Sequence, residues 1–345
     1  MRLWSPPIPV SAELILVVAI IAVALSFDFI NGFHDAANSI ATVVATRVLT
    51  PLQAVIWAAF FNFISAFSFG TGVAKMVGTG MVDLSAVTPY VILCGLAGAI
   101  VWDLITWWLG LPTSSSHALF GGYAGAAIAR TSSLQVLVWK GWIKTVVFMA
   151  VAPFLGLLAA FAFMIAVYWI FRNSTPKKMD VYFRKLQLLS AAAFSYSHGT
   201  NDAQKTMGII TGVLVSAKYL PAFHVPVWVI LAAHAAIGLG TFSGGWRIVH
   251  TMGSRITRLK PRGGFCAETA AATSILLATA VGVGVSTTHV ITGAIAGVGS
   301  VQRLKAVRWG VAANIVWGWV LTIPCAAAVA WSLYTLLHSL GLDPR

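Results

Sequence analysis

Two polar stretches interrupt otherwise apolar sequence and contain residue types that bind cations or protons. The first spans residues 28–38 and contains Asp28, Asn31, Asp35 and Asn38. The second spans residues 195–206 and contains Ser195, His198, Asp202 and Lys205. Residues three or four apart share one face of a helix, so each stretch predicts a polar stripe. A carboxylate inside a membrane is costly unless it is paired or hydrated, and such residues typically line an ion or substrate path. The alternative is a polar network that only holds helices together.

Two further segments each place three consecutive hydroxyl side chains after a helix breaker. Pro112 precedes the first triplet, and Gly282 and Gly284 precede the second. The triplets are Ser114, Ser115, Ser116 and Ser286, Thr287, Thr288. Ser and Thr are favoured N-caps, and a helix N-terminus offers unpaired N–H groups and partial positive charge to an anion. Two such termini facing each other would form a neutral, donor-rich anion site. The alternative is that the hydroxyls bond only to carbonyls of their own helix.

The composition indicates the solvent in which these segments fold. Of the 345 residues, 59% are hydrophobic and 9% are charged, whereas soluble domains contain roughly 25% charged residues. A soluble enzyme and a nucleic-acid-binding protein are therefore excluded, despite the net charge of +13. Basic residues gather in short segments between apolar runs, as in cytoplasmic loops of membrane proteins. We expect an all-α multi-pass membrane protein with about 10–12 hydrophobic segments, some of them discontinuous or re-entrant.

The three cysteines give no sign of a metal site or a disulfide framework. Cys94, Cys266 and Cys325 lie in apolar runs without a CxxC spacing, and an odd number does not suit a set of disulfides. We expect no metal site and no resident cofactor.

A strongly basic segment divides the chain near its midpoint. We assign residues 172–186 as a cytoplasmic linker between a first membrane repeat, residues 1–171, and a second, residues 187–345. Two other basic segments, residues 247–262 and 303–308, are expected on the same side.

The two halves carry related motifs at nearly constant offsets. Gly32, Asp35 and Ala36 align with Gly199, Asp202 and Ala203. The first hydroxyl triplet aligns with the second, and each is followed by a GxxxG motif, at Gly121 and Gly125 and at Gly293 and Gly297. Such small residues allow close helix packing. Internal repeats with interrupted apolar segments are typical of secondary transporters, in which inverted repeats hold the substrate at their interface.

These motifs resemble those of the inorganic phosphate transporter (PiT) family over nearly the whole chain. The family's Asn-Asp-x-x-Asn core after a glycine is similar to residues 32–38 and 199–205, and its phosphate-contacting loops are similar to residues 112–117 and 285–289. Residues 264–269, with Glu268, resemble an acidic helix start of the family. The resemblance implies that the two hydroxyl triplets hold phosphate. It implies that the coupled cation is held by Asp35, Asn38, Asn201 and Asp202.

Three departures from the family pattern bear on the coupling ion. His34 replaces the first Asn of the motif, Lys205 replaces the last Asn of the second copy, and Asn62 stands where sodium-coupled eukaryotic members carry Glu. The chain thus resembles the bacterial low-affinity, proton-coupled branch. We expect the Lys205 ammonium to lie against Asp202 and to stand in for one sodium ion. The alternative is that Lys205 extends to the headgroup region.

The sequence therefore predicts a secondary active transporter of the bacterial inner membrane that imports inorganic phosphate by cation symport. Protons are the expected coupling ion, with Glu268, Asp35 and Asp202 as their carriers, because carboxylates in a low dielectric can be tuned to exchange protons near neutral pH. Sodium-coupled phosphate symport and a sulfate permease on the same scaffold remain alternatives. The expected partners are phosphate, the coupling cation and the lipid bilayer, but not nucleic acid. A divalent metal bound to phosphate and a second copy of the chain, as a homodimer, are further candidates.

We do not expect an enzyme. A membrane-embedded serine hydrolase built on Ser115 or Ser116 is disfavoured, because His117 follows these serines directly and adjacent helical residues do not face each other.

Overall fold

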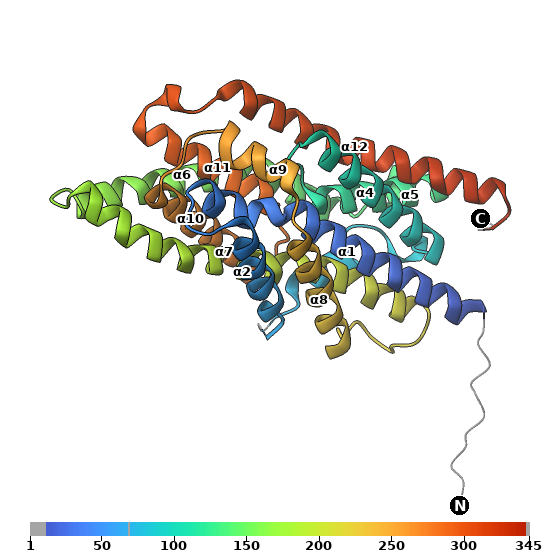
Figure 1. The fold of residues 1–345 in the computed structure, drawn as a ribbon. Coiled ribbons are helices and arrows are strands. Elements are labelled where there is room, and N and C mark those ends of the chain that lie inside the picture. The colour runs from blue at the N-terminus through green and yellow to red at the C-terminus, as the bar shows by residue number, and fades with distance from the viewer. Residues whose placement is uncertain (1–11, 68–69, 343–345) are drawn as a thin grey trace, which may run out of the picture.

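The computed structural model describes residues 12–67 and 70–342, and the chain is helical almost throughout this range (Figure 1). The first half contains α1 (Ala12–Ala45), α2 (Pro51–Ile64), α3 (Gly72–Thr79), α4 (Pro89–Leu109), α5 (Ser115–Thr131) and α6 (Trp139–Ile170). The second half contains α7 (Pro176–Ser216), α8 (Val227–Ser243), α9 (Trp246–His250), α10 (Pro261–Ala280), α11 (Thr287–Gln302) and α12 (Trp309–Ser339). Short helical turns complete the list at η1 (Ser65–Phe67), η2 (Leu84–Ala86), η3 (Leu134–Val136), η4 (Thr251–Arg255) and η5 (Leu304–Ala306).

Several helices are long and apolar enough to cross a membrane. Within the described residues, α1, α4, α6 and α12 meet this condition. Two bent pairs, α2 with α3 and α8 with α9, raise the number of candidate spans from 4 to 6, and the second pair bends by 62°. By contrast, α5 and α11 have only 17 and 16 residues, fewer than the roughly 20 that a full crossing needs. The prediction of an all-α membrane protein with discontinuous helices is confirmed.

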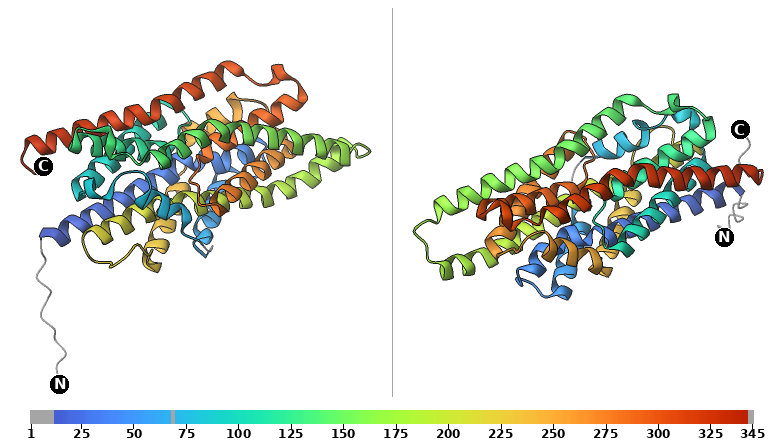
Figure 2. Two further views of the ribbon diagram at one scale, coloured as in Figure 1. Left: turned by 180° about the vertical axis from the view of Figure 1, so that it is seen from behind. Right: turned by 90° about the horizontal axis from the view of Figure 1, so that it is seen from above.

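The two halves of the chain are interleaved. The short helix α5 packs along α12 of the other half, and α11 packs along α6 in the same way. Likewise α1 packs on α8, and α7 packs on α2. Views from behind and from above show the long helices α6 and α12 on the outside of the bundle (Figure 2). The exchange of partners is reciprocal, whereas an inverted-topology relation between the halves stays a prediction.

The predicted GxxxG motifs make the cross-half contacts close. A Cβ atom at Gly121 or Gly125 would collide with the backbone carbonyls of Ile323 or Ala327 on α12. A Cβ atom at Gly293 or Gly297 would collide with carbonyls of Pro153 and Leu157 on α6. These four positions therefore need glycine, because any side chain would push the half-helices away from the long helices that support them.

The basic segment at the midpoint differs in form from the predicted linker. Residues 171–174 form a turn, and α7 begins at Pro176. Proline suits the first turn of a helix because its missing N–H would be unpaired there anyway, so Pro176 starts a helix where the sequence analysis assigned a linker. The outermost residues of the two predicted repeats, 1–11 and 343–345, lie outside the described residues.

The three basic segments gather at one end of the molecule. The backbone N–H of Arg308 donates to the Ile256 carbonyl at 3.0 Å, which joins the segments 303–308 and 247–262. The segment 172–185 lies beside the segment 247–262, because Asp180 lines a cavity together with Lys260 and Arg262.

This arrangement makes a topological prediction. Single cysteines introduced into residues 172–185, 247–262 or 303–308 should all be protected from a membrane-impermeant thiol reagent added to whole cells, because positively charged loops stay in the cytoplasm. The same cysteines should react in inside-out vesicles. Labelling of any one segment from the cell exterior would contradict the predicted orientation.

Candidate functional site

Asp35 of the first polar stripe and Asp202 of the second lie close together where α1 packs on α7. His198 stands between them, with Nε2 3.8 Å from Asp35 Oδ2 and 3.7 Å from Asp202 Oδ2. On its other side, Nδ1 lies 3.0 Å from Asn62 Oδ1. Because the Asn62 amide nitrogen donates to Thr241, its oxygen accepts from Nδ1 and leaves Nε2 to face both carboxylates. Ligand atoms of Asp35, His198 and Asp202 lie within 4.8 Å of one another, a spacing that can hold a small cation.

The Asp35 carboxylate connects the first stripe to the second hydroxyl triplet. Its Oδ2 accepts from Thr287 at 3.3 Å and from Thr288 at 3.4 Å. Asn38, one turn further along α1, donates to Thr288 at 2.8 Å. The other carboxylate oxygen of Asp35, Oδ1, lies 2.9 Å from Nδ1 of His34. Asp35 and Asn38 thus hold the N-terminus of α11, 252 and 250 residues away in the chain.

Lys205 connects the second stripe to the first hydroxyl triplet. Its ammonium donates to Asp202 at 2.7 Å, to the Val285 carbonyl at 3.1 Å and to the Ser116 hydroxyl. Three acceptors match the three donors of an ammonium. The side chain is 1% exposed, so it lies in the protein interior beside Asp202 and does not extend to the headgroup region.

In each hydroxyl triplet, the first residue caps a helix and the other two lie in the first turn of that helix. Ser114 and Ser286 are the N-caps of α5 and α11, and each accepts from the backbone N–H three residues later at 3.3 Å. The helices therefore begin at Ser115 and Thr287 because the capping hydroxyls satisfy one of the unpaired N–H groups. The second and third hydroxyls of each triplet remain for other partners. The structure brings α5 to Lys205 and α11 to Asp35, so both helix N-termini reach the same buried centre.

Asn201 has a different role from its neighbour Asp202. Its amide donates to Thr279 at 2.7 Å and to the Val283 carbonyl at 3.2 Å, and its oxygen accepts from the N–H of Val285 at 3.2 Å. These contacts hold the loop between α10 and α11. Asn201, predicted to bind the cation, therefore fixes the approach to the second triplet and does not face the two aspartates.

Glu268 belongs to a separate polar cluster. It accepts from Thr42 and Ser190 at 2.5 Å each and from Gln187 at 3.0 Å, and all four side chains are buried. Thr42 lies two helical turns beyond Asp35 on α1, about 10 Å at 1.5 Å per residue. The structure thus does not bring Glu268 to the predicted site.

The histidines after the triplets pack as structural groups. The His289 ring stacks on Trp319 with centroids 3.8 Å apart, and His117 meets it edge-on at 4.9 Å. His289 Nδ1 lies 3.3 Å from the Met149 carbonyl. That carbonyl has no helical donor because Pro153, four residues on, lacks an N–H. A catalytic pairing of His117 with the adjacent serines gains no support from this geometry.

Sequence reasoning missed one acid of this region. Asp103 is fully buried on α4, and its neighbours are His34 and Asp35 of α1 and the Ser115 hydroxyl of α5. It is the one acid in the apolar run of α4. A lone acid in the middle of an apolar span is a recognised sign of function and could have identified it.

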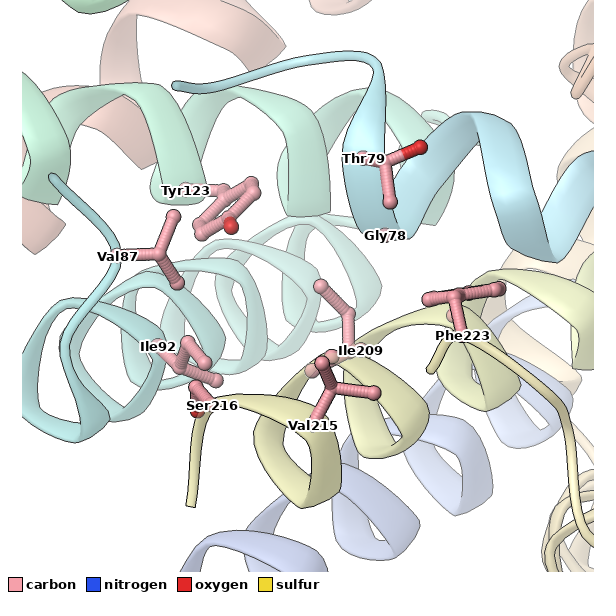
Figure 3. Close-up of a pocket in the computed structure, with 11 residues that line it drawn as sticks. Gly78, Thr79, Val87, Ile92, Tyr123, Ile209, Val215, Ser216 and Phe223 are labelled. Carbon is pink, nitrogen blue, oxygen red and sulfur yellow. The ribbon is translucent and has the colours of Figure 1, made fainter. Parts of the chain in front are cut away.

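Two cavities lie near these residues. One, of about 490 Å³, is lined by residues of η1, α3, α7 and α10, including Thr200, Gln204 and Thr279. Since Thr279 accepts from Asn201, this cavity borders the loop that leads to the second triplet. The other, of about 320 Å³, lies between α3, α4, α5 and α7 and has mostly apolar walls such as Val87, Ile92 and Ile209 (Figure 3). Its lining residues contain none of the predicted site residues, so it is a poor candidate for an anion site.

Comparisons with known proteins point to one family. A sequence profile described as "Phosphate transporter family" matches residues 31–330. A protein from Rhizobium meliloti (strain 1021), named "Probable low-affinity inorganic phosphate transporter", is 54% identical over 320 residues, covering 92% of this chain and 96% of that protein. A protein of the same name from Bacillus subtilis (strain 168) is 44% identical over 333 residues, covering 94% of this chain and 98% of that protein.

One solved structure has the same fold. It is titled "The sodium-dependent phosphate transporter" and superposes with a TM-score of 0.87 at 27% sequence identity, covering 94% of this chain and 100% of that chain. The resemblance inferred from the motifs is confirmed. The relatives are named as transporters, in agreement with the prediction that the chain is not an enzyme.

Proposed function

Because the chain belongs to the phosphate transporter family, we propose that it imports inorganic phosphate across the bacterial inner membrane by symport with protons. The observation that carries this proposal is the meeting of two helix N-termini at one buried, charged centre. The hydroxyls of α5 and α11 reach Lys205 on one side and Asp35 on the other. N–H groups, hydroxyls and an ammonium are the donors that an oxyanion needs.

Lys205 supports protons over sodium as the coupling ion. Its ammonium already neutralises Asp202 and reaches Ser116 and Val285, so a positive charge is tethered where the related sodium-coupled pattern carries an amide. The proton must then be carried by the carboxylates that Lys205 does not neutralise, and Asp35 is the candidate at the centre. Glu268, in its separate cluster on the path along α1, would carry the proton before or after that centre. A homodimer and co-transport of a divalent metal stay predictions.

The two hydroxyl triplets provide the first test. Ser115→Ala and Thr287→Ala should each weaken binding of labelled phosphate to the purified protein by about 1–3 kcal/mol, the range expected when a buried anion loses one donor. The matched control is Thr292→Ala, which removes an equally buried hydroxyl from the same helix as Thr287 but away from its N-terminus. Normal expression with unchanged affinity in both triplet variants would show that the triplets only pack helices.

A further inference from the structure

Asp103 is a buried acid whose hydrogen-bonding capacity is unused. It is fully inaccessible to solvent, and neither carboxylate oxygen is paired in a hydrogen bond of regular geometry among the described residues, the Ser115 hydroxyl of α5 being the donor beside it. The Ser115 hydroxyl beside it also has no hydrogen-bond partner in the described part of the chain. The Asp103 carboxylate thus lies beside the Ser115 hydroxyl at the N-terminus of α5, and both groups can still form hydrogen bonds with a ligand.

The charges around Asp103 define what can approach it. The titratable groups that act on it are His34 and Asp35, both from α1, while α5 contributes the Ser115 hydroxyl. His34 is occupied, since its ring nitrogens contact Asp35 at 2.9 Å and Thr106 at 3.1 Å. Burying a carboxylate without a partner is costly. Beyond the adjacent Ser115 hydroxyl, the described residues supply no donor to this carboxylate, so it keeps the capacity to accept a hydrogen bond from a bound ligand.

We propose that Asp103 accepts a hydrogen bond from a protonated oxygen of the transported anion and thereby selects phosphate over sulfate. Phosphate carries at least one O–H group at neutral pH, whereas sulfate carries none and presents only acceptors. The Ser115 hydroxyl and the first N–H groups of α5 donate to the unprotonated oxygens. A sulfate oxygen in the same position carries no proton. It and the Asp103 carboxylate oxygen are both acceptors, so no hydrogen bond can form between them. The inference rests on the proposed function, since it names the group that recognises the substrate.

The other carboxylates of the centre are less suited to this task. Asp35 already accepts from Thr287 and Thr288 and pairs with His34. Asp202 is paired with Lys205 at 2.7 Å. Asp28 has two oxygens without partners among the described residues, as Asp103 has, but its neighbours are Thr206, Asp202, Asn31 and Lys205, not the first triplet.

The test compares anion selectivity in three variants reconstituted into proteoliposomes. Uptake of labelled phosphate is measured at fixed pH against unlabelled arsenate, which carries a proton as phosphate does, and against unlabelled sulfate. Asp103→Asn adds a donor and removes the charge, so it should lower the preference for phosphate over sulfate by roughly tenfold to a hundredfold. Asp103→Glu keeps the acceptor and should keep the preference. Asp28→Asn is the matched control, an equally buried and unpartnered acid, and should keep the wild-type selectivity whatever its rate.

If Asp103→Asn transports too slowly, competition of sulfate with labelled phosphate for binding to the purified variant gives the same ratio. An Asp103→Asn protein that excludes sulfate as well as the unchanged protein does would overturn the inference. Loss of binding of both anions would also overturn it, because a selectivity residue must leave the rest of the site able to bind. If the unchanged protein took up sulfate as readily as phosphate, the proposed function itself would fail.

Discussion

Asp35→Asn and Asp202→Asn should each reduce phosphate uptake by at least about a hundredfold while the protein still inserts into the membrane. Asn keeps the shape of Asp but removes the charge. Asp202→Asn leaves the Lys205 ammonium without its carboxylate, and breaking a buried ion pair costs about 3–5 kcal/mol. Asp35→Asn weakens the acceptor that receives Thr287 and Thr288 at the start of α11. Asp35→Asn also removes a proton-binding group from the centre.

Uptake of labelled phosphate into proteoliposomes at equal protein content measures this effect. Asp180→Asn makes the same chemical change on the exposed face of α7 and should leave uptake at the wild-type level. Wild-type rates in both Asp35→Asn and Asp202→Asn would mean that these carboxylates are structural.

Lys205→Asn should abolish transport or make it dependent on sodium. The change removes the tethered positive charge and leaves Asp202 buried without its partner at 2.7 Å. A sodium ion can then take the place of the ammonium, as in the related sodium-coupled pattern. Uptake by this variant is therefore measured with sodium, potassium or choline as the external cation. Lys75→Asn, which alters an exposed lysine on α3, serves as the control.

A double variant separates the ion pair from the fold. Asp202→Asn with Lys205→Asn removes both charges, so its thermal stability should exceed that of either single variant, because no lone charge is left buried. Transport should nevertheless stay impaired. A Lys205→Asn protein that remained fully active without sodium would refute the role assigned to Lys205.

The features that the sequence predicts correctly depend on residues close together in the chain. Ser114 and Ser286 follow helix breakers, and the helices begin directly after them because capping depends only on neighbouring residues. Lys205 lies against Asp202 because residues three apart share a helix face.

Contacts between distant segments could not be predicted from the sequence. The bonds of Thr287 to Asp35 and of Lys205 to Ser116 join residues from different halves of the chain, and their pairing depends on how α1, α5, α7 and α11 pack. Packing also placed Glu268 with Thr42 and Ser190, away from the aspartates. Asp103 carries no motif, and its importance becomes visible only when its neighbours and its empty oxygens are known.

The central claim, phosphate uptake driven by protons, is tested most directly by imposing one ion gradient at a time. Purified protein in proteoliposomes is given an inward proton gradient without sodium, or an inward sodium gradient at equal pH, and the uptake of labelled phosphate is followed. The account predicts accumulation with the proton gradient and no stimulation by the sodium gradient. Accumulation driven by sodium at equal pH, with none driven by protons, would contradict it.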